Sequence, residues 1–212
     1  MDLNFFKKIR ILDGGMGQQL LANGLVSKGT LWSTSAILDK KFHRLVIDVH
    51  LSFINSGADA IVTNTFSSRK FRLIQNKVDK HFSYVNEKAC LLSVKAKEMS
   101  KSKVLIAGSL PGQRDTYVED KRQLKNIEKD FYDQAKIIGP YVDFFYLDVI
   151  SSGREIDCAS NVAAKLNKPV LVGAHLKKNG LLPSGESLSY VLKKYRNKNW
   201  IGLIGACVSP EI

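Results

Sequence analysis

The sequence predicts an α/β fold, and within that class a TIM-type (β/α) barrel in preference to an open doubly wound sheet. The first observation is that short apolar runs alternate along the chain with helical patterns. These runs are apolar throughout, which is typical of parallel strands buried on both faces. The second is that polar residues gather where the runs end, at several strands rather than at one switch point.

The first half of the chain contains three strand patterns and three helix patterns. The predicted strands are residues 9–12, 58–66 and 103–110, and the predicted helices are residues 16–24, 40–57 and 82–100. Gly24 and Gly57 follow the first two helical patterns, where glycine commonly ends a helix. The strands therefore have helices between them, as parallel strands require.

The second half repeats this alternation three more times. The predicted helices are residues 123–139, 154–166 and 184–197, and the predicted strands are residues 142–150, 169–176 and 200–208. Each strand follows a helix, so the total is about six of the eight strands of a complete barrel.

Composition limits the class of protein. The chain has 212 residues, of which 44% are hydrophobic, and this favours a single domain over residues 1–212. Its net charge of +12 comes from lysines interleaved with acids and apolar residues, which indicates solvated helix faces rather than a nucleic-acid surface. Three scattered cysteines indicate reduced thiols. With neither a membrane-length apolar run nor a secretory signal, we expect a cytoplasmic protein without a membrane partner.

Five segments of the chain resemble the homocysteine S-methyltransferase family, in the family's order. They are LDGGMGQQLLANG, GADAIVTNTF, IAGSLPG, KPVLVGAHLKKNGLLPSGESL and IGLIGACVSPEI. The resemblance implies a barrel that binds zinc through thiolates and transfers a methyl group from a small donor to homocysteine, giving methionine.

The resemblance also implies which residues bind the amino acid. Homocysteine carries an ammonium group, so Asp13 is the expected partner, and Gly14 and Gly15 allow ligand and backbone to approach closely. From the residues alone, an equal alternative is that Asp13 caps the following helix. Asp148 is the expected second contact for the amine, at a position where the family usually has glutamate.

Three further residues complete the predicted site. Asn64 and Thr65 match the family's second strand and would line the pocket floor, although ordinary loop hydrogen bonding explains them equally well. Cys207 aligns with the first zinc-binding cysteine of the family. A zinc-bound homocysteine sulfur would stay deprotonated near neutral pH. Taken alone, a cysteine at a strand end is more often a small buried hydrophobic residue.

The chain departs from the family pattern after its sixth predicted strand. Family members continue through two more strand and helix units, which supply two adjacent cysteines. Cys207 alone leaves the zinc site incomplete, even if His175 added an imidazole. Three explanations follow. A partner chain or a homo-oligomer completes the barrel, the chain is a shortened copy of a family member, or the chain retains ligand binding only.

These features leave three hypotheses of function. The first is a zinc-dependent homocysteine S-methyltransferase, in which no residue of this chain is assigned as catalytic beyond the metal ligand. The second is a non-catalytic homocysteine-binding or interaction module. The third is a different barrel enzyme that acts on a small anionic substrate, attracted by the basic charge.

Overall fold

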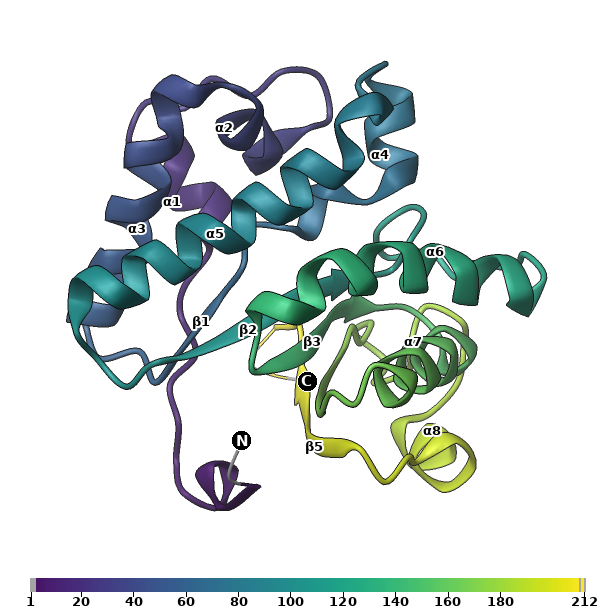
Figure 1. Ribbon diagram of the computed structural model, residues 1–212. Helices are drawn as coiled ribbons and strands as arrows, with labels where there is room; N and C mark the ends of the chain where they lie inside the picture. Colours follow the sequence, from purple (N-terminus) through teal and green to yellow (C-terminus); the bar gives the residue numbers. More distant parts are fainter. Residues whose placement is uncertain (1–2, 210, 212) are drawn as a thin grey trace.

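The computed structural model describes residues 3–209 and residue 211, so the outermost residues of the predicted 1–212 domain lie outside it. Within the described residues, five strands form one parallel sheet (Figure 1). They are β1 (Ala60–Val62), β2 (Leu105–Pro111), β3 (Phe144–Ile150), β4 (Val170–Ala174) and β5 (Trp200–Gly205). The α/β class is confirmed.

The strands lie in the sheet in the order in which they occur in the chain, β1-β2-β3-β4-β5. Each strand therefore pairs with its successor, and the order has no reversal of the kind that makes a switch point in a doubly wound sheet. This order is that of a barrel, but the described residues do not show the barrel closed.

The predicted first strand is wrong. Residues 9–12 contribute one isolated parallel bridge, from Leu12 to Ala60, and Ile9 is 96% exposed. The Ile11 N–H donates to the Asp59 carboxylate at 3.0 Å, and the Ile11 carbonyl accepts from the Ala60 N–H at 3.3 Å, so the segment pairs with β1 over one bridge only. The strand count is consequently five and not six.

The other predicted elements all overlap an observed element of the same type. The long helices are α1 (Met16–Ala22), α3 (His43–Asn55), α5 (Phe82–Ser100), α6 (Leu124–Ile138), α7 (Gly153–Lys165) and α8 (Leu188–Tyr195). Their ends differ from the predicted ends by a few residues, except for α5, which agrees at both ends. Long periodic patterns are the most reliable signal in a sequence because many residues contribute to each.

Short elements were not predicted, because one or two turns are too short to show a helical period. They are α2 (Ser35–Leu38), α4 (Lys70–Gln75) and the 3₁₀ turns η1 (Leu3–Lys7), η2 (Trp32–Thr34), η3 (Lys40–Phe42), η4 (Phe66–Ser68), η5 (Asp79–His81) and η6 (Gly139–Tyr141). Two of them, η2 and η4, contribute residues to the functional site.

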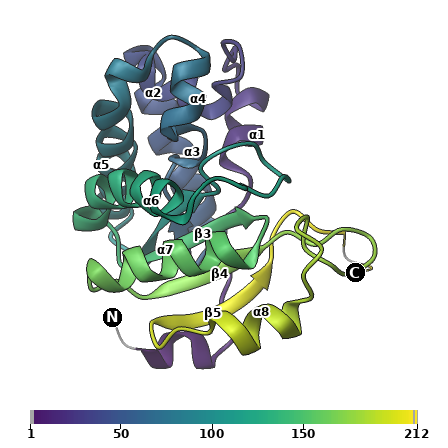
Figure 2. The same cartoon turned by 90° about the vertical axis from the view of Figure 1, so that its right-hand side faces the viewer.

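Helices cover one face of the sheet. Helix α6 packs against β2, and α7 packs against β3 and β4 (Figure 1 and Figure 2). The main core joins them to the sheet through residues such as Phe131, Phe145 and Val172. A second apolar cluster holds α1, α2, α3 and α5 together beside β1. None of the helices in the described part of the chain has the length and hydrophobicity of a membrane span.

Candidate functional site

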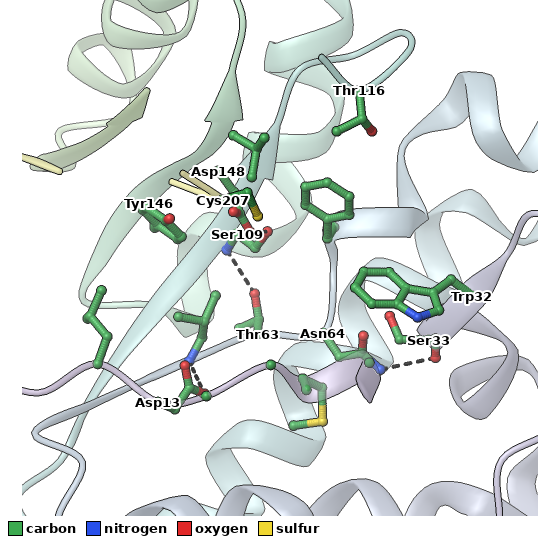
Figure 3. A pocket seen from close by; sticks show the side chains of 18 of the residues that line it. Asp13, Trp32, Ser33, Thr63, Asn64, Ser109, Thr116, Tyr146, Asp148 and Cys207 are labelled. Carbon is green, nitrogen blue, oxygen red and sulfur yellow. Dashed lines mark hydrogen bonds between the residues drawn. The ribbon is translucent and has the colours of Figure 1, made fainter. Parts of the chain in front are cut away.

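A cavity of about 490 Å³ opens at the carboxyl ends of β1, β2 and β3 (Figure 3). Six of the seven residues predicted for the site line it: Asp13, Gly14, Gly15, Asn64, Asp148 and Cys207. They are far apart in the chain, and the parallel sheet brings them together because the ends of its strands share one edge.

Asp13 is held by the backbone of β1. Its N–H donates to the Ala60 carbonyl at 3.0 Å, and its Oδ2 accepts from the Val62 N–H at 2.8 Å. The helix-cap alternative is wrong, because Gly15 is the N-cap of α1 and no side chain bonds to that helix start. Burial raises the pKa of Asp13 to about 7, and the negative charge of Asp148 adds to the rise. The hydrogen bond from the Val62 N–H lowers the pKa and only partly offsets these effects.

Asp148 lies near the end of β3, beside a break in the strand pairing. The register of β3 against β4 shifts between Leu147 and Ile150, and Val149 has a φ of 60°. Such a bulge redirects neighbouring side chains. The Ser109 hydroxyl donates to Asp148 Oδ2 at 2.6 Å. Burial raises the pKa of Asp148 to about 6, although the Ser109 hydrogen bond and the charge of Arg69 oppose the rise.

Asn64 and Thr65 have different places. Asn64 lines the cavity, and its amide donates to the Ser33 carbonyl at 3.1 Å. Thr65 lies behind the wall, where its hydroxyl donates to the Ser109 carbonyl at 2.7 Å. The expectation that Thr65 lines the pocket floor is therefore corrected, because its hydroxyl is directed to the backbone of β2. Thr63, a polar residue at the end of the same predicted strand that was not assigned to the site, lines the cavity instead.

The two glycines after Asp13 differ in what they require. A Cβ at Gly14 would lie 2.8 Å from the ring of Phe53, so a larger residue there requires that ring to move. A Cβ at Gly15 would meet only the Gln18 side chain at 3.7 Å, an ordinary contact. The packing around Gly15 therefore has room for a side chain. A requirement for glycine at this position would come from the ligand.

Cys207 is an exposed cysteine on the cavity wall, after the end of β5. Cys90 and Cys158 are buried and line no part of this cavity. In the part of the chain that the structure describes, no group of three histidine, cysteine or acidic side chains is placed to hold a metal ion. His175 bonds the Ala206 carbonyl at 3.3 Å instead. The described residues therefore supply one thiolate and do not by themselves form a zinc site.

Four aromatic residues line the cavity that the sequence did not indicate. They are Trp32, Phe66, Tyr117 and Tyr146. Trp32 and Phe66 meet edge to face at 6.1 Å, and the Tyr117 ring lies 4.5 Å from that of His175. Three of the four lie in turns or loops, where no periodicity marks a residue as buried or functional.

Backbone strain concentrates on this cavity. Seven non-glycine residues have a positive φ in the described chain, and four of them line it: Trp32, Tyr117, Val149 and Cys207. The other three follow the ends of helices, where such a φ is common. A β-branched residue such as Val149 rarely adopts this conformation. Strain of this kind is found preferentially at functional sites.

Together, these residues place two acidic side chains and four aromatic rings around one cavity. Two carboxylates from separate elements face one cavity, and none of the ion pairs in the described residues includes either of them. Aromatic faces nearby attract positive charge as well. Acids with strongly raised pKa values in a cleft are typical of functional sites.

Comparison with known proteins gives a consistent result. The family model described as Homocysteine S-methyltransferase matches residues 10–212. Homocysteine S-methyltransferase 2 of Saccharomyces cerevisiae is 23% identical over 91% of this chain and 66% of its own length. S-methylmethionine–homocysteine S-methyltransferase BHMT2 of Rattus norvegicus is 27% identical over 76% of this chain and 41% of its own. The chain thus spans less than two thirds of either relative.

A solved structure has the same fold. The metallated form of the homocysteine methyltransferase MmuM from Escherichia coli superposes with a TM-score of 0.84 at 18% identity. The match covers 99% of this chain and 78% of that one.

Proposed function

Because the chain belongs to the homocysteine S-methyltransferase family, we propose that its cavity binds homocysteine for methyl transfer to the homocysteine sulfur, giving methionine. One observation carries the proposal. Asp13 and Asp148, from different elements, line the same cavity without a basic partner in the described chain. The ammonium group of a bound amino acid would supply the positive charge that these two carboxylates lack.

The ammonium group would change the charge of both carboxylates. Burial raises the pKa of Asp13 to about 7 and that of Asp148 to about 6, so both are partly protonated near neutral pH without ligand. A cation between them favours their ionised forms. Binding would then release protons, and the amine would be held by charge-assisted hydrogen bonds. Gly15, with no side chain, leaves room for the ligand against the backbone.

The aromatic lining supports a positively charged methyl donor. Trp32, Phe66, Tyr117 and Tyr146 line the cavity, and aromatic faces attract sulfonium and quaternary ammonium groups. S-methylmethionine, named as the donor of the rat relative, is a sulfonium and is the first donor to test. In the transfer, the homocysteine sulfur forms the new bond to the methyl carbon with its own electron pair. The donor sulfur leaves with the pair of the broken bond.

Zinc enters the proposal only through Cys207. Its thiol would be one ligand, and the others would have to come from outside the described residues, so no step is assigned to a metal. Zinc bound by thiolates would keep the homocysteine sulfur ionised. Zinc per chain, measured after purification without chelator, is expected to fall in Cys207→Ser. An equal zinc content in both proteins would remove Cys207 from the metal site.

Calorimetric titration with homocysteine tests the proposal. We expect the wild-type chain to bind it and Asp148→Asn to bind it at least about 100-fold more weakly, since one buried charge partner is lost. Asp157→Asn, a change on α7 outside the cavity, is the control and should bind normally. Binding of sugar phosphates but not of homocysteine would overturn the proposal.

A binding module without catalysis is the second candidate. Asp13 and Asp148 can hold an amino acid without Cys207, because neither carboxylate depends on the thiol for its hydrogen bonds. Methionine formation from homocysteine and S-methylmethionine separates the two candidates. Turnover by the zinc-loaded chain supports the enzyme, whereas homocysteine binding without turnover, with zinc present, supports the module.

A further inference from the structure

Arg69 is a buried cation beside the cavity that the proposed function does not use. Arg69 is the largest of the fully buried side chains in the described residues, with 1% of its surface exposed. It immediately precedes α4. Burial lowers the pKa of Arg69 to about 10, so the guanidinium still carries its charge near neutral pH. A buried charge is usually paired, because leaving water is unfavourable unless an opposite charge compensates.

Arg69 has few partners. Its Nη2 donates to the Thr116 hydroxyl at 2.8 Å, and its Cζ lies 5.1 Å from the centre of the Phe66 ring. Its buried Nε has no hydrogen-bond partner among the residues that the structure describes. No ion pair found within residues 3–209 and 211 includes Arg69.

The charges around Arg69 lie farther away. The acids Asp115, Asp148 and Glu155 favour its charged form from a distance, and Arg72 opposes it. Glu155 is itself bonded to the Ser152 hydroxyl at 2.6 Å. Acids therefore lie around Arg69, but within the described residues none of them contacts it as an ion pair.

Thr116 transmits this charge to the cavity. A guanidinium only donates hydrogen bonds, so the Thr116 oxygen accepts from Arg69 and keeps its own proton to donate. No acceptor for that proton occurs among the described residues, and Thr116 lines the cavity. Figure 3 shows Thr116 on a loop well apart from Asp13. A polarised donor thus faces the cavity, away from the residue expected to bind the amine.

We propose that Thr116, with Arg69 behind it, forms a subsite for a carboxylate of the ligand in this cavity. The inference rests on the proposed function and deepens it, because it divides the site into a cation-binding part at Asp13 and Asp148 and an anion-binding part at Thr116. The carboxylate belongs either to homocysteine or to an amino-acid methyl donor such as S-methylmethionine. Arg69 acts through Thr116 and is a positioning residue.

The test compares acids with their amides. Dissociation constants of homocysteine, S-methylmethionine and their carboxamides are measured by calorimetry on the full chain. The ratio of amide to acid dissociation constants reports recognition of the carboxylate. We expect a ratio of about 10 or more for at least one ligand in the wild type, as for a charge-assisted hydrogen bond. The ligand that shows the ratio identifies the source of the carboxylate.

Two variants should remove this ratio. Arg69→Met removes the charge and Thr116→Val removes the donor, and both ratios should fall to near 1. Thr116→Ser and Arg69→Lys should retain most of the ratio. Arg72→Met, which removes a neighbouring cation on α4, is the matched control and should leave it unchanged. If Arg69→Met does not fold, Thr116→Val decides.

The melting temperature separates this role from a structural one. If Arg69 serves only the fold, Arg69→Met lowers the melting temperature and leaves the ratio intact, and the inference is overturned. Equal binding of acids and amides by the wild type also overturns the inference. The proposed function would still stand in that case if homocysteine binds. If no amino acid binds at all, the proposed function falls, and the inference falls with it.

Discussion

The two edges of the sheet use the same hydrogen bond in different electrostatic surroundings. At the carboxyl edge, Asp13 Oδ2 accepts from the Val62 N–H at 2.8 Å. At the amino edge, Asp143 Oδ2 accepts from the Ile106 N–H at 2.8 Å, and Asp59 Oδ2 accepts from the Ile11 N–H at 3.0 Å.

The difference lies in the charges beside these acids. At the amino edge, Arg10 pairs with Asp59 at 3.1 Å and Lys97 pairs with Asp143 at 3.6 Å. At the carboxyl edge, Asp13 has no such base within the described residues, and burial raises its pKa to about 7. The amino edge is electrostatically complete, as expected of a face that serves stability, whereas the carboxyl edge lacks a cation that a ligand can supply.

The largest expected effect comes from exchanging one aspartate at each edge for asparagine. Asp13→Asn should weaken homocysteine binding at least about 100-fold, because the ammonium loses a buried charge partner. Asp143→Asn should leave binding unchanged and lower the free energy of unfolding by less than about 1 kcal/mol, since its ion pair is partly exposed. Calorimetry and urea unfolding measure the two effects. Equal loss of binding in both variants would contradict the comparison.

Binding at the carboxyl edge should depend on pH. Only the ionised carboxylates attract an ammonium group, and the pKa values of Asp13 and Asp148 are raised to about 7 and 6. Homocysteine affinity should therefore fall as the pH drops below about 7, by about 10-fold per pH unit for each required ionisation. Titrations between pH 5 and pH 8 in buffers of different ionisation enthalpy also report the released protons. An affinity independent of pH would argue against both carboxylates.

A separate effect concerns the stability of the ligand-free chain. Asp13 binds protons more tightly in the folded chain than in the unfolded chain, so its contribution to the free energy of unfolding decreases as the pH rises from about 4 to 7. Asp13→Asn removes this contribution. The variant should gain about 3 kcal/mol relative to wild type between these pH values, since each unit of the pKa difference is worth about 1.4 kcal/mol. Urea unfolding at pH 4, 5.5 and 7.5 measures it, and a constant difference would contradict it.

The smallest expected effect concerns backbone strain, which at the amino edge should affect stability without affecting ligand binding. Lys101 ends α5 at the amino edge with a φ of 55°, whereas the positive-φ residues of the carboxyl edge line the cavity. Lys101→Gly should raise the free energy of unfolding by about 0.5 to 1 kcal/mol, because glycine adopts this conformation without strain. Homocysteine affinity should not change. A loss of stability in thermal unfolding would show that the lysine side chain contributes more than its strained backbone removes.

The sequence by itself determined the α/β class, the order of the main elements and the strand ends where Asp13, Asn64, Asp148 and Cys207 gather. It could do so because apolar periodicity and the polar residues that end each run are local features. Asp13 was recognisable by its position after an apolar run and by its family motif.

Only the tertiary structure decided the remaining features, because they depend on residues distant in the chain. Within the described residues, the segment 9–12 meets the sheet only through the bridge from Leu12 to Ala60, and Asp13 bonds Val62 instead of capping α1. Arg69 meets Thr116 across 47 positions. No local pattern contains such pairs, since packing chooses them after the elements have formed.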